Sequence, residues 1–245
     1  MTSPRMTLRC AAATHPGLRR PANEDTVLAA HPVFLVADGM GGHADGELAS
    51  RAVISAFREL VGKTWVTAQD ITAAVQRAAD RVECLGCGDG APGSTLAGAA
   101  SARRAGIACW LLFNIGDSRI YLMRSGQLRR ISVDHSTRIS SAGPGTRGGL
   151  VRAFGAGLER PVADQWLTPA HAGDRILVCS DGLSDEVAGE YLERVLRERS
   201  EPQEVVRRLV GKALAEGGRD NISVIVVDCL ETVVTEIDEL DDVVS

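Results

Sequence analysis

The chain has 245 residues with a net charge of −5, and only 4% of them are aromatic. Six acidic residues and no basic residue lie between Glu231 and Ser245, so the rest of the chain carries −5 + 6 = +1. This nearly neutral body argues against a nucleic-acid-binding protein and against a basic membrane-binding surface. We therefore expect one domain over residues 1–230, followed by an acidic tail at 231–245 that is either a solvated end or a regulatory segment.

The first ninety residues predict three strands and then two helices. Short apolar runs bounded by Pro or Gly predict the strands, at Thr7–Thr14, Asp25–Ala30 and Val33–Ala37. Apolar residues recur at helical spacing over Leu48–Leu60 and Ile71–Val82. Thr67 and Asp70 have the spacing of a capping box at the start of the second helix. We expect the two helices to lie side by side on one face of a sheet.

The rest of the chain alternates strands with one more pair of helices. The predicted strands are Ser94–Ala100, Ile107–Ile115, Arg119–Arg124, Gln127–Ser132, Ile176–Cys179 and Ile222–Val227. Ser125-Gly126 predicts a tight hairpin turn, and Glu204–Ala215 is the clearer helix of the pair. Helices grouped around mainly antiparallel strands indicate the α+β class. No apolar run reaches the roughly 18 to 20 residues of a membrane span, and no signal-peptide core is present, so we expect a cytoplasmic protein.

Four short segments between residues 23 and 221 carry carboxylates next to predicted strands. They are Asn23-Glu24-Asp25, Asp38-Gly39, Ser180-Asp181-Gly182 and Asp220-Asn221. Carboxylates at the ends of buried strands are costly to desolvate, and they repel one another unless a cation lies between them. Carboxylate and carbonyl oxygens suit Mg²⁺ and Mn²⁺, whereas zinc prefers His and Cys. The segments favour a site for two Mg²⁺ or Mn²⁺ ions, although Asp-Gly alone also forms ordinary turns.

The order of these segments resembles the metal-dependent protein phosphatases of the type 2C class, the PPM family, in their compact bacterial form. The resemblance runs from Arg20 to Asp228. It includes Gly93-Ser94-Thr95-Leu96, Asn114-Ile115-Gly116-Asp117-Ser118-Arg119, Asp134-His135-Ser136 and Gly218-Arg219-Asp220-Asn221-Ile222. It implies a four-layer α-β-β-α sandwich, in which two mainly antiparallel sheets are flanked by helix pairs.

The resemblance also implies a set of metal ligands. Asp38 would bridge two Mn²⁺ or Mg²⁺ ions, with Asp181 and Asp220 at the first ion. Glu24 and the carbonyl of Gly39 would line the second. A water held between two such ions has a lowered pKa and would be the nucleophile.

Further residues have implied roles around these ions. Asp25 would orient metal-bound water, and Arg20 would bind phosphate through its guanidinium, so Arg20 and Asp38 are the implied catalytic residues. Asp117 with Asp181 matches a third metal position of bacterial members, although an Asp that only stabilises a turn is the alternative. Met40 stands where some members have a histidine proposed as the general acid. His43 is not assigned that role, and a metal-bound water is the expected proton donor.

The implied activity is hydrolysis of phosphoserine and phosphothreonine in proteins by a monomer that opposes a bacterial serine/threonine kinase. The glycine-rich segment Ser140–Gly157 matches the family's flap, with its helical portion shortened to a loop that we expect not to pack. One alternative is a non-catalytic relative that binds phosphoproteins. Another is a metal-dependent nuclease, for which a basic groove would be expected.

Overall fold

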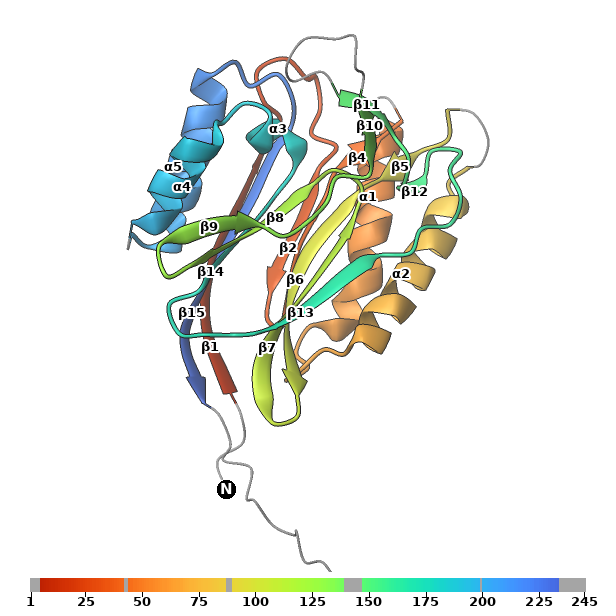
Figure 1. Ribbon diagram of the computed structural model, residues 1–245. Coiled ribbons are helices and arrows are strands. Elements are labelled where there is room, and N and C mark those ends of the chain that lie inside the picture. The colour runs from red at the N-terminus through yellow and green to blue at the C-terminus, as the bar shows by residue number, and fades with distance from the viewer. Residues whose placement is uncertain (1–4, 42–43, 87–89, 139–146, 199, 234–245) are drawn as a thin grey trace, which may run out of the picture.

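Two five-stranded sheets pack face to face in the computed structural model, with helices on both outer faces (Figure 1). The structure describes residues 5–41, 44–86, 90–138, 147–198 and 200–233. The strand order is β1-β15-β14-β8-β9 in the first sheet and β13-β7-β6-β3-β2 in the second. Neighbouring strands in both sheets are antiparallel. The predicted α-β-β-α sandwich is confirmed.

The first sheet joins the two ends of the described chain. Its strands are β1 (Arg5–His15), β8 (Arg119–Arg124), β9 (Gln127–Arg130), β14 (Arg175–Cys179) and β15 (Ile222–Val233). β15 pairs with β1 from Arg5 opposite Val233 to His15 opposite Ile222. The predicted hairpin turn between β8 and β9 is confirmed, because Ser125 and Gly126 both have positive φ, 51° and 77°.

The second sheet lies between the first sheet and two helices. It contains β2 (Thr26–Ala30), β3 (Val33–Ala37), β6 (Leu96–Arg104), β7 (Ile107–Ile115) and β13 (Asp164–Pro169). Every residue of β3 is buried, since side chains on both of its faces meet apolar layers. β13 was not predicted. It is an edge strand whose residues are half-buried or exposed, so it lacks the apolar pattern that marks a strand in sequence.

Helix pairs cover the outer faces of both sheets (Figure 1). α1 (Ala44–Phe57), the 3₁₀ turn η1 (Arg58–Leu60) and α2 (Ala68–Glu83) pack on the second sheet. α3 (Asp181–Ser184), α4 (Gly189–Arg197) and α5 (Pro202–Ala215) pack on the first. The predicted capping box is present at the start of α2. None of the helices in the described part of the chain is long and apolar enough to cross a membrane.

Short strands surround one end of the sandwich. β4 (Gly39–Met40), β5 (Gly93–Ser94) and β12 (Phe154–Gly155) form one small sheet, and β10 (Ser136–Arg138) pairs with β11 (Arg147–Leu150). Residues 140–146 of the glycine-rich segment lie outside the described residues. The expectation that this segment does not pack is wrong for its described part, because Phe154 is fully buried between β5 and α2.

Candidate metal centre and active site

A cleft of about 440 Å³ opens where β3, β7 and β14 end and where β2 and β15 begin. Figure 1 shows this end of the sandwich around α3, β4 and β5. All the residues to which the sequence assigned a site role, except Asp25, line the cleft: Arg20, Glu24, Asp38, Gly39, Asp117, Asp181 and Asp220. The two sheets thus bring together segments that are up to 200 positions apart in the chain.

Asp38 is fixed through its backbone by Thr95, whose contribution the sequence did not reveal. The Asp38 N–H donates to Thr95 Oγ1 at 3.1 Å, and the Thr95 N–H donates to the Asp38 carbonyl at 2.9 Å. Thr95 Oγ1 also lies 2.8 Å from Ser118 Oγ, the residue after Asp117. Thr95 therefore connects the two loops that carry Asp38 and Asp117. Thr95 lies directly before β6, in a segment that matched the family. That match was the sequence signal that could have pointed to its role.

The glycines after Asp38 and Asp181 are required by close backbone contacts rather than by turn conformation. A Cβ on Gly39 would lie 2.1 Å from the Gly46 carbonyl oxygen. A Cβ on Gly182 would lie 2.0 Å from the Asn221 carbonyl oxygen. Neither glycine has a positive φ. The two Asp-Gly pairs are thus places where segments pack backbone to backbone, which argues against the simple turn interpretation.

Asn221 holds the segment that carries Glu24, a role that sequence reasoning also missed. Its Oδ1 accepts from the Glu24 N–H at 2.8 Å. Its Nδ2 donates to the carbonyls of Ala22 at 2.8 Å and Pro16 at 3.0 Å. Asn221 is buried and directly follows Asp220, so one residue aligns the segments before β2 and before β15.

Asp38 lies among other carboxylates. Burial raises the pKa of Asp38 well above its usual value, and the charges of Asp25, Asp181, Asp117 and Asp220 raise it further. Like charges at this spacing disfavour one another's ionised forms, and a divalent cation removes that penalty. The electrostatics of the cleft therefore favour cation binding.

Asp25 is 6% exposed and does not line the cleft, but it lies close enough to interact with Asp38 and Asp220. Burial raises the pKa of Asp25 to about 6, although the Ser223 and Ser180 hydroxyls lie near enough to oppose the rise. Neither carboxylate oxygen makes a hydrogen bond of normal geometry with the described residues. A buried carboxylate without such a bond requires a further partner, and a metal ion or a metal-held water would provide one.

Arg20 extends to the cleft from the segment before β2. Its Nη2 lies 2.7 Å from Asp220 Oδ2, and about half of its side chain is exposed. An exposed pair of this kind contributes at most about 1 kcal/mol. The guanidinium is therefore accessible to an anion that enters the cleft.

The cleft residues suit hard divalent cations in their chemistry, since all the candidate ligands are oxygen atoms. Among the described residues, no three His, Cys, Asp or Glu side chains already have the spacing of a complete metal site. Mg²⁺ keeps several water ligands and needs only one or two carboxylates, so a complete protein shell is not required. The donor set and the buried Asp25 therefore fit Mg²⁺ or Mn²⁺. His43 lies outside the described residues.

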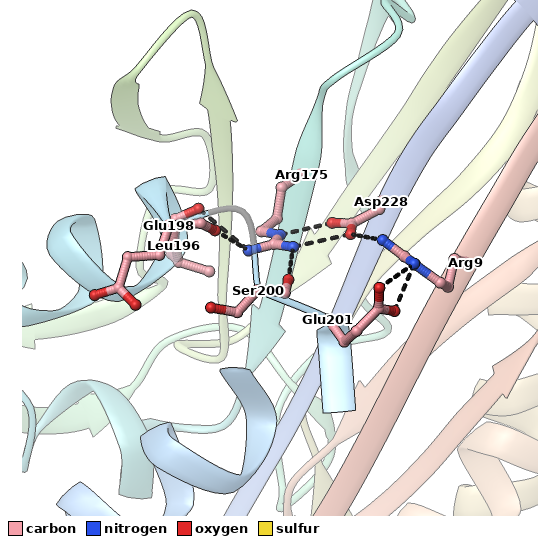
Figure 2. Close-up of polar contacts among 7 residues, drawn as sticks. All are labelled: Arg9, Arg175, Leu196, Glu198, Ser200, Glu201 and Asp228. Carbon is pink, nitrogen blue, oxygen red and sulfur yellow. Dashed lines mark hydrogen bonds and ion pairs between the residues drawn. The ribbon is translucent and has the colours of Figure 1, made fainter. Parts of the chain in front are cut away.

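A second cavity, of about 600 Å³, lies beside the β8–β9 turn. Three charged residues that line it, Arg9, Arg175 and Asp228, are paired. Figure 2 shows Arg175 with Asp228, and Arg9 with Asp228 and with Glu201. These residues join α4 and α5 to the first sheet. The arrangement is structural, and it is separate from the carboxylate cleft.

Comparison with known proteins identifies the class that the fold and the cleft define. Residues 22–216 match the family model for protein phosphatase 2C, and the chain belongs to this family. It is 35% identical over 243 residues to the serine/threonine protein phosphatase PstP of Mycobacterium tuberculosis, covering 92% of this chain and 46% of PstP. It therefore spans about half the length of that relative. The predicted family is confirmed.

A further relative and a solved structure agree with this membership. The serine/threonine phosphatase Stp of Listeria monocytogenes is 29% identical over 221 residues, covering 80% of this chain and 84% of Stp. The solved structure of the catalytic domain of PstP, in complex with two manganese ions, superposes with a TM-score of 0.78 at 36% identity. That match covers 91% of this chain and 99% of the solved one.

Proposed function

We propose that the chain is a metal-dependent protein phosphatase that hydrolyses phosphoserine and phosphothreonine side chains. The observation that carries this proposal is the convergence of five carboxylates and Arg20 on one cleft: Glu24, Asp38, Asp117, Asp181 and Asp220. Membership of the protein phosphatase 2C family supports it, as do the names of the relatives.

Two Mn²⁺ or Mg²⁺ ions are the proposed cofactors. Asp38 would be shared, Asp181 and Asp220 would hold one ion, and Glu24 with the Gly39 carbonyl would hold the other. When bound, such ions supply Lewis-acid stabilisation of the phosphoryl group and lower the pKa of water. The manganese complex of the PstP catalytic domain supports two ions in this family.

The chain's own residues would bind and orient the reactants. Arg20 would bind two oxygens of the phosphoryl group, which requires it to exchange its exposed Asp220 partner for the substrate. It would thereby stabilise charge on the transferring group and align it for in-line attack. Asp25, which is buried, would accept a hydrogen bond from the attacking water and fix its direction.

The proposed substrates are phosphorylated proteins, including targets of a serine/threonine kinase that this phosphatase would oppose. The half-exposed Arg20 and the open cleft favour recognition through the phosphate group itself. The family match covers residues 22–216, and we propose residues 1–230 as the catalytic unit.

The experiment is release of phosphate from a phosphothreonine peptide by metal-stripped protein, titrated with Mn²⁺ and with Mg²⁺. Asp38→Asn and Asp181→Asn are the test variants. Asp80→Asn is the matched control, because Asp80 is exposed on α2 and pairs with Arg160 away from the cleft. We expect metal-dependent turnover in the wild type and the control, and its loss in both test variants.

Absence of turnover with either ion, in protein shown to be folded, would contradict the proposal. The alternative of a non-catalytic protein that binds phosphoproteins would then be favoured. Turnover that survives in Asp38→Asn would instead contradict the proposed ligand set.

A further inference from the structure

Two hydrogen bonds join His135 to Gly116. The His135 N–H donates to the Gly116 carbonyl at 3.0 Å, and the Gly116 N–H donates to His135 Nδ1 at 3.0 Å. Asn114 Nδ2 donates to the same carbonyl at 3.1 Å. His135 is only 8% exposed, so water competes little for these bonds. Both polar groups of Gly116 are therefore held in place.

The second nitrogen of the ring is fixed as well. Because Nδ1 accepts a hydrogen bond, the proton of the neutral ring lies on Nε2. Nε2 lies 3.0 Å from Asp164 Oδ2, to which it donates. Arg152 Nη1 also lies 3.1 Å from Nε2, but a guanidinium cannot accept a hydrogen bond, so the Asp164 carboxylate is the acceptor for the Nε2 proton. Arg152 Nη1 donates to the other oxygen of Asp164 at 2.6 Å. Asp164 at the start of β13 thus fixes the tautomer that the contact with Gly116 requires.

Gly116 controls the path of the chain into the cleft. It has a φ of 98°, and a Cβ on it would lie 2.6 Å from Thr95 Cγ2. The next residue, Asp117, is 8% exposed and lines the cleft. The residue after it, Ser118, contacts Thr95, which in turn binds the backbone of Asp38. The peptide held by His135 is therefore directly attached to the loop that places Asp117 near Asp38.

We propose that His135 is a positioning residue, which holds the Gly116 peptide so that Asp117 keeps its place and the cleft binds a divalent cation more tightly. This inference rests on the proposed function, because it gives Asp117 a part in holding Mn²⁺ or Mg²⁺. His135 itself touches neither the ion nor the substrate.

The test compares two substitutions of His135. One keeps a polar atom near Nδ1, which faces Gly116, and the other keeps one near Nε2, which faces Asp164. His135→Asn keeps an acceptor close to the position of Nδ1, whereas His135→Gln keeps a polar group near Nε2 but none near Nδ1. Binding of Mn²⁺ to metal-stripped protein is measured by calorimetry. We expect the dissociation constant to rise about 10-fold or more in His135→Gln and less than about 3-fold in His135→Asn. His171→Gln, at an exposed histidine between β13 and β14, is the matched control.

A double-mutant cycle shows whether the effect passes through Asp117. In an Asp117→Ala background, His135→Gln should weaken Mn²⁺ binding no further. A loss that remains undiminished in that background would overturn the proposal. So would wild-type affinity in His135→Gln, even if the metal-free protein melts at a lower temperature, because that result indicates a role in stability alone.

Asp164→Asn decides the matter if His135→Gln does not fold. The Asp164 side chain is 38% exposed, so the substitution is tolerable, and it removes the carboxylate that orients the ring. We expect Mn²⁺ binding to weaken several-fold, and unchanged binding would overturn the proposal.

A wild-type protein that neither binds Mn²⁺ nor releases phosphate contradicts the proposed function. A wild type that does both, with unaltered binding in these variants, contradicts only the role of His135.

Discussion

Arg175 binds Asp228 at two points inside the first sheet, with Nε 2.6 Å from Oδ1 and Nη2 2.9 Å from Oδ2 (Figure 2). Its remaining N–H groups donate to the carbonyls of Glu198 and Ser200 at 2.8 and 2.6 Å, and to Leu196 at 3.4 Å. One buried guanidinium thus joins β14 and β15 to the connection between α4 and α5. All five donors of the side chain are used.

Replacement of Arg175 should be strongly destabilising. Among the described residues, Arg175→Met leaves Asp228 with only a longer contact to Arg9, at 3.5 Å, and it leaves three carbonyls without their donor. We expect a loss of roughly 3–5 kcal/mol in the free energy of unfolding, measured by urea denaturation. Arg207→Met is the control, since Arg207 and Glu204 are exposed, and it should leave the free energy of unfolding almost unchanged. Similar losses of unfolding free energy in both variants would show that the buried ion pair stabilises the fold no more than the exposed one.

Arg20 should affect substrate binding more than metal binding. If its guanidinium holds phosphate, Arg20→Ala should raise KM for a phosphothreonine peptide by roughly 10- to 100-fold, as expected for a lost hydrogen bond between charged groups. The Mn²⁺ concentration for half-maximal activity should change little. Arg19→Ala, at the exposed neighbouring arginine, should behave as the wild type. An unchanged KM in Arg20→Ala would remove Arg20 from phosphate binding.

Asn221 should be needed to keep Glu24 in position. Asn221→Ala leaves the Glu24 N–H and the Ala22 and Pro16 carbonyls without their partner. We expect a loss of about 1–3 kcal/mol in the free energy of unfolding. Calorimetry should also show weaker Mn²⁺ binding. Gln127→Ala, at an exposed position in β9, is the control for removing a side-chain amide. Full Mn²⁺ affinity in Asn221→Ala would mean that Glu24 is positioned without it.

The sequence predicted the fold well where strands are apolar throughout, as in β3 and β14. It also indicated a carboxylate site, because Asp38, Asp181 and Asp220 each lie next to an apolar strand. It could not predict Thr95 and Asn221 as organising residues, since their importance comes from contacts across 57 and 197 positions. It missed β13 because an edge strand exposes one side and needs no apolar alternation.

The loop that carries Asp220 should respond to acid through Glu186. The backbone N–H and the Nε and Nη2 of Arg219 all donate to this carboxylate, at 2.8 to 2.9 Å. These hydrogen bonds lower the pKa of Glu186 from its usual value of 4.5, against the opposing effect of burial. A lowered carboxyl pKa stabilises the folded protein above the unfolded-state value, and this contribution is lost as the pH falls through the folded-state value.

Glu186→Gln measures that contribution. In metal-free protein, the stability gap between the wild type and Glu186→Gln should be full at about pH 6 and should shrink as the pH falls below about 4. Urea denaturation at a series of pH values gives the gap directly. Glu190→Gln, at an exposed position in α4, is the control for replacing a glutamate carboxylate by an amide. A stability difference between the wild type and Glu186→Gln that does not change with pH would contradict the proposed contribution of the Glu186–Arg219 ion pair.

The pairing of β1 with β15 along the whole of β1 has a consequence during protein synthesis. Asp220 and Asn221 directly precede β15, the last strand in the described part of the chain, and Asn221 aligns the segment that carries Glu24. While β15 is still inside the ribosome, β1 has no partner in the sheet and the cleft lacks one wall. A growing chain therefore cannot assemble this site early, and the cleft first exists when the first and last strands of the fold meet.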